Sequence, residues 1–208
     1  VVGCDGGGSF LRKAMGVRLE DLGFDEPWLV LDMLLTAPVD LPELNIQFCD
    51  PARPATFVRG PGALRRFEFM LLPGEAPQDV VAPDNVWSLL RPWLTPSQAK
   101  IWRAATYRFH ALVAEDWRRG KALLAGDAAH QTPPFLAQGL NQGLRDVVNL
   151  SWKLSAVLGG APETLLDSYQ AERRPNVREV IAITKALGRE ICERDPSAAE
   201  ARNQRLRA

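Results

Sequence analysis

A short apolar run, a proline-stiffened loop and a long amphipathic stretch follow one another between Ala122 and Leu158. The run 122–125 predicts a buried strand, and the stretch from Gly139 predicts a helix that ends at Gly159-Gly160. Seven apolar residues form one stripe along that helix, namely Leu140, Leu144, Val147, Val148, Leu154, Val157 and Leu158. A strand that leads through a loop into a helix is typical of open α/β sheets, in which ligands bind at the carboxyl ends of the strands.

The residues at this strand end have a chemistry that suits a ligand. The Asp127 carboxylate can accept hydrogen bonds from hydroxyl groups, and Gly126 lets a ligand approach the backbone. The first N–H groups of the helix from Gly139 have no partner within the helix, so its N-terminus favours an anion or an electron-rich carbonyl. Local chemistry alone leaves two alternatives open, a structural turn at Gly126-Asp127 and a plain connection that Pro133-Pro134 stiffens.

The rest of the chain predicts a mixed α+β fold. Val1 to Asp5 reads as a strand, and Ser9 to Met15 as a short helix with Ser9 as its N-cap. Prolines and glycines separate strand-like segments in a largely antiparallel sheet, at 28–36, 44–49, 56–59 and 65–72. Further elements are a helix over 84–94, a strand over 107–114, a helix that Pro162 opens, and a charged helical tail over 175–207.

We expect three parts along the chain. Residues 1–16 form a strand–turn–helix remnant of one domain, residues 17–105 a sheet domain, and residues 106–208 the C-terminal part of the first domain with trailing helices. Because Val1 begins inside a strand-like run, we expect the chain to be a fragment of a longer protein, called the full-length parent below.

Composition excludes several classes of partner. The 25 basic residues balance 25 acidic ones, so no net charge favours nucleic acid or an anionic membrane. No apolar run reaches the roughly 18 residues of a membrane span. We expect no signal peptide, because Val1 opens inside a strand-like run without a charged n-region. Three separated cysteines, Cys4, Cys49 and Cys192, indicate free thiols in a reducing cytoplasm, without a zinc site.

Two motifs carry a resemblance to a known family. The segment GDAAHQTPPFLAQGLNQGLRDVVNLSWKL, from Gly126 to Leu154, resembles the second FAD motif of the group A flavoprotein aromatic hydroxylases. The segment VVGCDGGGSFLR, from Val1 to Arg12, is similar to their D-G-x-x-S-x-x-R signature. Segments between these motifs, such as FDEPWLVLDMLL and RRFEFMLLPGE, resemble the 3-(3-hydroxyphenyl)propionate hydroxylase branch, and the resemblance spans essentially the whole chain.

The resemblance implies FAD as cofactor and assigns residues to it. Asp127 would meet the ribose or ribityl region, the N–H groups of Leu140 and Asn141 would face the flavin pyrimidine, and the loop from Pro133 to Gly139 would lie against the isoalloxazine. The first motif is associated with FAD and NAD(P)H. The cofactor-binding residues expected in this way are Asp5, Gly6, Arg12, Gly126, Asp127, Pro133, Gly139, Leu140 and Asn141. No catalytic residue and no metal ligand is assigned.

The implied activity is a monooxygenase reaction in the full-length parent. NAD(P)H would reduce FAD, O2 would form a flavin C4a-hydroperoxide, and one oxygen atom would pass to a phenolic substrate such as a 3-(3-hydroxyphenyl)propionate. A homodimer is left open. Alternatives are a non-catalytic substrate-domain fragment that cannot bind FAD, and a related flavin epoxidase or halogenase.

Two departures from the family pattern bear on this expectation. Ala137 stands where the family usually has glycine, which would strain the loop by about 1 kcal/mol if the position needs a positive φ. The G-x-G-x-x-G unit that holds the ADP half of FAD is absent, since Gly6-Gly7-Gly8 followed by Leu11 does not fit it. We therefore expect the chain alone to be inactive.

The remaining polar and aromatic candidates favour structural roles. His110 reads as a sheet-facing residue, and His130 as a residue that organises the loop by hydrogen bonds. Aromatic residues that could line a pocket are better explained as core, namely Trp28, Phe67 and Phe69. The pairs Arg118-Arg119 and Arg173-Arg174 read as solvated charges, with pairing to a propionate substrate as the alternative for an arginine.

Overall fold

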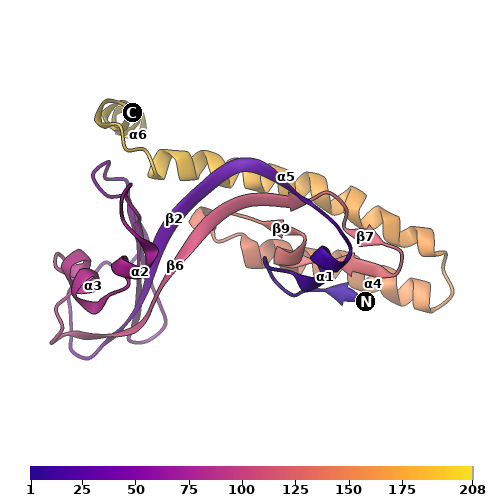
Figure 1. The fold of residues 1–208 in the computed structure, drawn as a ribbon, viewed down its shortest axis with the longest axis horizontal. Helices are drawn as coiled ribbons and strands as arrows, with labels where there is room; N and C mark the ends of the chain where they lie inside the picture. The colour runs from indigo at the N-terminus through magenta and orange to yellow at the C-terminus, as the bar shows by residue number, and fades with distance from the viewer. Residues whose placement is uncertain (208) are drawn as a thin grey trace. The chain divides into compact units, whose positions relative to one another are not determined.

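The structure, a computed structural model, describes residues 1–207, and Figure 1 shows its helices and strands. The chain folds into two compact units. Unit 1 consists of Val1–Asp25 and Phe109–Gly188, and unit 2 of Glu26–Arg108 with the C-terminal residues from Arg189. Each unit is described by itself.

Unit 1 contains the strand, loop and helix on which the sequence analysis depends. Its three-stranded sheet has the order β1-β8-β7, with β1 at Val2–Gly3, β8 at Ala122–Leu124 and β7 at Arg118–Arg119. Strands β1 and β8 are parallel, so the chain leaves both at the same edge of the sheet. The glycine turn after β1 and the Gly126 turn after β8 therefore lie at one edge.

The helices of unit 1 follow the predicted order. Helix α1 spans Phe10–Ala14, and its N-cap Ser9 accepts a hydrogen bond from the Arg12 N–H, as predicted. After β8 come three short elements, η1 (Gly126–Ala128), β9 (His130–Gln131) and η2 (Pro134–Leu136). Helices α4 (Gly139–Leu158) and α5 (Asp167–Ile191) then lie side by side, joined by the short η3 (Glu163–Leu166) (Figure 1).

The bounds of α4 confirm the predicted helix over 139–158. Its buried residues are Gln142, Asp146, Leu150 and Lys153, so the face turned into the unit is largely polar. The apolar stripe lies on the other side, and Leu140 and Val148 are 76% and 72% exposed. An apolar face of this kind has no cover within the described residues.

The core of unit 1 is built around large aromatic residues. Trp117 and Tyr169 are fully buried, with ring centroids 5.4 Å apart. Their polar atoms are satisfied, since Trp117 Nε1 donates to the Ala114 carbonyl at 3.2 Å and the Tyr169 hydroxyl donates to the Leu124 carbonyl at 3.0 Å. The Tyr169 bond fixes β8 against the first turn of α5.

Unit 2 is a mainly antiparallel sheet with short helices. Strands β3 (Ile46–Phe48), β4 (Ala55–Arg59) and β5 (Leu64–Met70) pair in that order. Next in the sheet come β2 (Leu19–Leu35) and β6 (Ala99–Ala114). Residues 19–25 of β2 and 109–114 of β6 belong to unit 1. Helices α2 (Pro77–Val80), α3 (Pro83–Leu90) and α6 (Pro196–Arg207) complete the unit. The α+β fold class is confirmed.

The core of unit 2 confirms the structural role expected for its aromatic residues. Phe67 and Phe69 are buried and pack with Phe57 and Trp93, and Trp28 is fully buried. The strands β2 and β6 begin earlier than the segments predicted at 28–36 and 107–114. No helix in residues 1–207 is both long and apolar enough to cross a membrane.

Candidate functional site

The turn after β8 presents Asp127, whose carboxylate the sequence analysis expected to bind a ligand. Gly126 has a φ of +61°, a left-handed conformation that a side chain would strain. The next residue, Asp127, is exposed, and its carboxylate has no hydrogen-bond or ion-pair partner within the described residues. The left-handed conformation of Gly126 therefore determines the direction in which the free Asp127 carboxylate points from the sheet edge.

A cavity of about 480 Å³ opens beside this turn, here called the glycine-lined cavity. Glycines from three segments form part of its wall, and at these positions backbone rather than a side chain faces the space. The residues that line it are Cys4, Gly6, Ala125, Gly126, Asp127, Gly139, Leu140, Gly143, Leu144 and Val147. The cavity brings together five of the nine residues expected to bind the cofactor, from three separate stretches of sequence.

The N-terminus of α4 borders the same cavity. The N-cap Gln138 makes no side-chain capping bond, and the first backbone bond within the helix runs from the Gln142 N–H to the Gln138 carbonyl at 2.9 Å. The N–H groups of Gly139, Leu140 and Asn141 thus have no acceptor in the part of the chain that the structure describes. Such a helix end carries about half a positive charge and attracts an electron-rich group.

The two charged residues of the first motif, Asp5 and Arg12, are both held by hydrogen bonds within the protein. The Asp5 carboxylate accepts bonds from the Ser9 hydroxyl at 2.6 Å and the Leu11 N–H at 3.0 Å, and these bonds lower the pKa of Asp5. The buried guanidinium of Arg12 donates to the carbonyls of Gly7 at 2.6 Å and Ala128 at 2.8 Å. Of this motif, Cys4 and Gly6 line the glycine-lined cavity, whereas Asp5 and Arg12 hold its surroundings in place.

Behind the Gly126 turn lies a buried ionic network that the sequence did not reveal. The Asp146 carboxylate accepts bonds from the Gly126 N–H at 2.9 Å, from His130 Nε2 at 2.7 Å and from Arg173 Nε at 2.9 Å. Arg173 also donates to the Gln142 side-chain oxygen at 2.6 Å. Asp146, His130 and Gln142 are fully buried. His130 organises the loop by hydrogen bonding, as predicted.

The pKa of Asp146 reflects two opposed effects. Burial alone would raise it, but the bonds and charges of His130, the Gly126 N–H and Arg173 outweigh burial and lower the pKa. The carboxylate is therefore ionised at neutral pH and acts only as an acceptor. It follows that His130 Nε2 carries the proton in this hydrogen bond.

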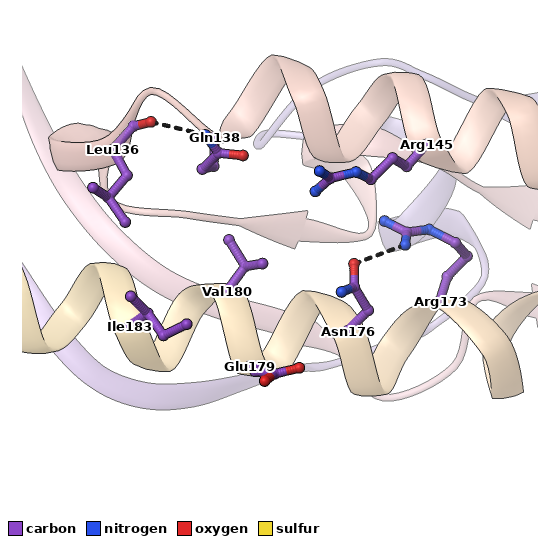
Figure 2. Close-up of a pocket in the computed structure, with 8 residues that line it drawn as sticks. All are labelled: Leu136, Gln138, Arg145, Arg173, Asn176, Glu179, Val180 and Ile183. Atoms are coloured by element: carbon purple, nitrogen blue, oxygen red, sulfur yellow. Dashed lines mark hydrogen bonds between the residues drawn. The ribbon is translucent and has the colours of Figure 1, made fainter.

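The prediction that Arg173 is a solvated charge is wrong. Its side chain is buried because it neutralises Asp146, which lies 27 residues earlier in the chain on another helix. Figure 2 shows Arg173 reaching from α5 toward α4, with a bond of 2.9 Å from its Nη1 to Asn176. Arg118 is also largely covered and pairs with Asp167 at 2.7 Å, so its charge is not free either.

A second cavity, here called the α4–α5 groove, has a volume of about 630 Å³ (Figure 2). Its lining residues are Leu136, Gln138, Arg145, Arg173, Asn176, Glu179, Val180 and Ile183. Arg145 and Glu179 are exposed charges of opposite sign without partners in the described residues. The groove holds none of the nine expected cofactor residues.

The loop before α4 contains the one non-glycine residue with a positive φ in residues 1–207. Ala137 has φ 51° and ψ 35°, the left-handed region in which alanine is strained. Position 137 therefore has the positive φ on which the strain expected from the sequence depended. Pro133 is buried at the start of the same loop, and Asn141 is exposed on α4, and neither lines the glycine-lined cavity.

His110 lies on β6, with its Nδ1 3.3 Å from an Asp25 carboxylate oxygen. The pair is partly exposed within unit 1 and does not line the glycine-lined cavity.

Known proteins resemble this chain over nearly all of its length. A family model described as "FAD binding domain" matches residues 1–184. A probable NADH-specific resorcinol 4-hydroxylase from Rhodococcus jostii is 46% identical over 207 residues, which cover 99% of this chain and 39% of that protein. A 3-(3-hydroxy-phenyl)propionate/3-hydroxycinnamic acid hydroxylase from Mycolicibacterium smegmatis is 39% identical, covering 100% of this chain and 37% of that protein.

A solved structure agrees with these relatives. Aklavinone-11 hydroxylase, in a ternary complex with FAD and aklavinone, superposes with a TM-score of 0.84 at 27% identity, covering 92% of this chain and 37% of that one. The chain thus spans about two fifths of the length of the relatives it matches. It belongs to the FAD binding domain family.

Proposed function

We propose that this chain forms the flavin-facing wall and the sheet unit of an FAD- and NADH-dependent hydroxylase that acts on a phenolic ring. The observation that carries the proposal is the glycine-lined cavity. A free carboxylate, Asp127, and an uncapped helix end at Gly139 meet there at a wall that includes four glycines.

The residues at this cavity fit part of FAD. Ribityl or ribose hydroxyls need an acceptor, and the Asp127 carboxylate is free to be one. The pyrimidine edge of a flavin bears carbonyls that gain negative charge on reduction, and the N–H groups of Leu140 and Asn141 are donors without acceptors. The glycines at 6, 126, 139 and 143 leave room for a flat ligand to approach the backbone.

Each group would then have a defined task. Asp127 would bind and orient the sugar chain, and the first turn of α4 would stabilise negative charge at the pyrimidine edge without a cationic side chain. Bound FAD supplies the redox chemistry by which one oxygen atom of O2 enters the ring. The loop from Pro133 to Gly139, with Pro133 and Phe135 buried, would keep water from one side of the flavin.

The names of the relatives support the choice of substrate and reductant. One is described as a probable NADH-specific resorcinol 4-hydroxylase, and another as a hydroxylase of 3-(3-hydroxyphenyl)propionate and 3-hydroxycinnamic acid. Both names denote hydroxylation of a ring that already carries a hydroxyl group. We therefore assign a meta-hydroxylated phenol as substrate class and NADH as reductant. Three free cysteines fit a cytoplasmic location.

The test is a substrate panel on the full-length parent. NADH and NADPH oxidation is measured with resorcinol, 3-(3-hydroxyphenyl)propionate, phenol and a ring without a hydroxyl group, and the products are identified by mass. The expected result is faster NADH oxidation with one of the meta-hydroxylated rings and a product heavier by one oxygen atom. Oxidation that no phenol stimulates, or no oxygenated product, contradicts the proposal.

A further inference from the structure

The Asp146 carboxylate ties four elements of unit 1 together. Its partners lie on η1 (Gly126), β9 (His130) and α5 (Arg173), and Asp146 itself lies on α4. Both carboxylate oxygens are used: Oδ2 accepts from Gly126 and His130, and Oδ1 accepts from Arg173. A fully buried carboxylate with three donors is fully ionised and rigidly held.

The bond to Gly126 matters most because of where that residue lies. Gly126 directly precedes the free Asp127 carboxylate and has a left-handed backbone. Its Cα also lies close to α4, 3.6 Å from the position of a Cβ on Gly143. Asp146 is thus bonded to the turn on one side of the glycine-lined cavity while it belongs to the helix on the other side.

We infer that Asp146 is a positioning residue of the flavin site, which holds the Gly126 N–H so that the Asp127 carboxylate and the first turn of α4 face the same cavity. His130 and Arg173 keep this carboxylate charged and oriented. The inference rests on the proposed function, since it assigns a task to residues behind the FAD-facing wall. It adds residues that do not themselves line the glycine-lined cavity.

A second carboxylate offers a matched control. Glu172 also links α4 and α5, through bonds from Lys153 Nζ and Asn149 Nδ2, each 2.7 Å long. It does not contact the segment 126–130, and its side chain is 49% exposed. Asp146→Asn and Glu172→Gln therefore each remove one charge between the same two helices, and only the first variant removes a partner of Gly126.

An amide cannot replace the Asp146 carboxylate. Asn has one acceptor oxygen and an NH2 group, so in either orientation its NH2 group faces N–H donors, from Arg173 or from Gly126 and His130. We expect Asp146→Asn in the full-length parent to weaken FAD binding about ten- to hundred-fold. The Glu172→Gln variant should stay within about twofold of wild type.

The experiment has two readouts, the FAD dissociation constant by flavin fluorescence and the hydrogen exchange of the Gly126 amide. The inference predicts weak FAD binding and fast Gly126 exchange in Asp146→Asn, with both near wild type in Glu172→Gln. Equal FAD affinity and equal Gly126 protection in the two variants overturn it. A merely structural role would speed amide exchange throughout unit 1, so faster exchange confined to the Gly126 turn, together with weaker FAD binding, identifies a positioning role.

If Asp146→Asn does not fold, Arg173→Lys serves as a second variant for the same two measurements. Lysine retains the positive charge beside Asp146, but it lacks the planar guanidinium with which Arg173 donates to Asp146 and Gln142 at once. Weaker FAD binding with faster Gly126 exchange supports the inference, and wild-type values for both overturn it. If the wild-type parent takes up no FAD, the proposed function fails, and the Gly126 exchange in the variants alone decides whether Asp146 holds the turn.

Discussion

The guanidinium of Arg12 donates a hydrogen bond of 2.8 Å to the backbone carbonyl of Ala128, 116 residues further along the chain. This bond joins the two motifs that the sequence presents far apart. Arg12 thus supports the turn that carries Asp127, and its two Nη atoms are both used by protein carbonyls, at Gly7 and Ala128. Arg12, which the resemblance assigned to cofactor binding, links two turns of the protein in the structure.

Replacing Arg12 should therefore reduce stability. Arg12→Ala removes the donor to the buried Ala128 carbonyl and one of two donors to the half-buried Gly7 carbonyl, and we expect a loss of about 2–3 kcal/mol in the free energy of unfolding. The control is Arg18→Ala, which breaks an exposed pair with Glu115 and should cost less than about 0.5 kcal/mol. Urea unfolding of both variants makes the comparison, and equal losses would contradict the role given to Arg12.

Ala137→Gly should stabilise the protein. Ala137 has a φ of 51°, and glycine adopts this conformation without strain, so we expect a gain of up to about 1 kcal/mol in the free energy of unfolding. Ala129 provides the control, because its φ of −97° suits alanine and glycine there should lower stability. Thermal unfolding of the two variants should shift in opposite directions, and a shared loss would show that the loop carries no strain.

Acid should weaken the link between α4 and α5. Bonds from Lys153 and Asn149 lower the pKa of Glu172 from 4.5 to about 2. A lowered folded-state pKa means that Glu172 contributes stability above pH 4.5, and this contribution is lost as the pH falls toward 2. Urea unfolding between pH 6 and about 2 should show a steeper loss in wild type than in Glu172→Gln. Parallel curves would contradict the assignment.

Gly139→Ala should separate stability from cofactor binding. A Cβ at Gly139 would meet no protein atom within 4 Å, and alanine is the better helix former by about 0.5–1 kcal/mol. The unfolding free energy should therefore stay equal or rise, while FAD binding weakens because the methyl group enters the wall of the glycine-lined cavity. Gly8→Ala is the control, with similar open space away from that cavity. Unchanged FAD affinity in Gly139→Ala would place the flavin elsewhere.

Local patterns were enough to predict the elements that position the site. Helix α4 was predicted with its observed bounds, because glycines mark both ends and apolar residues recur at helical spacing. The first half of β2 was not predicted, because it contains Asp21, Gly23 and Asp25, residue types that are rare in strands. The sheet tolerates them because they lie at exposed positions. Helix α5 continues through Pro175, a residue that usually ends a helix pattern.

The ionic network behind the site could not be predicted from local patterns. Asp146 and Arg173 lie on separate helices, and nothing in the spacing of a charged residue shows that tertiary packing will bury it beside an opposite charge. The one sequence signal was Asp146 itself, a charged residue at a position that helical spacing turns away from the apolar stripe. Most of that stripe proved to be exposed, so the polar face was the buried one.

The FAD affinity of Asp127→Ala tests the central claim most directly. The control is Glu179→Ala, which removes another exposed and unpartnered carboxylate, on the α4–α5 groove instead of the glycine-lined cavity. Flavin bound per protein and the FAD dissociation constant are measured for both variants and for wild type in the full-length parent. The account predicts that Asp127→Ala binds FAD at least about tenfold more weakly than wild type while Glu179→Ala retains it. Wild-type flavin content and affinity in Asp127→Ala would contradict the account.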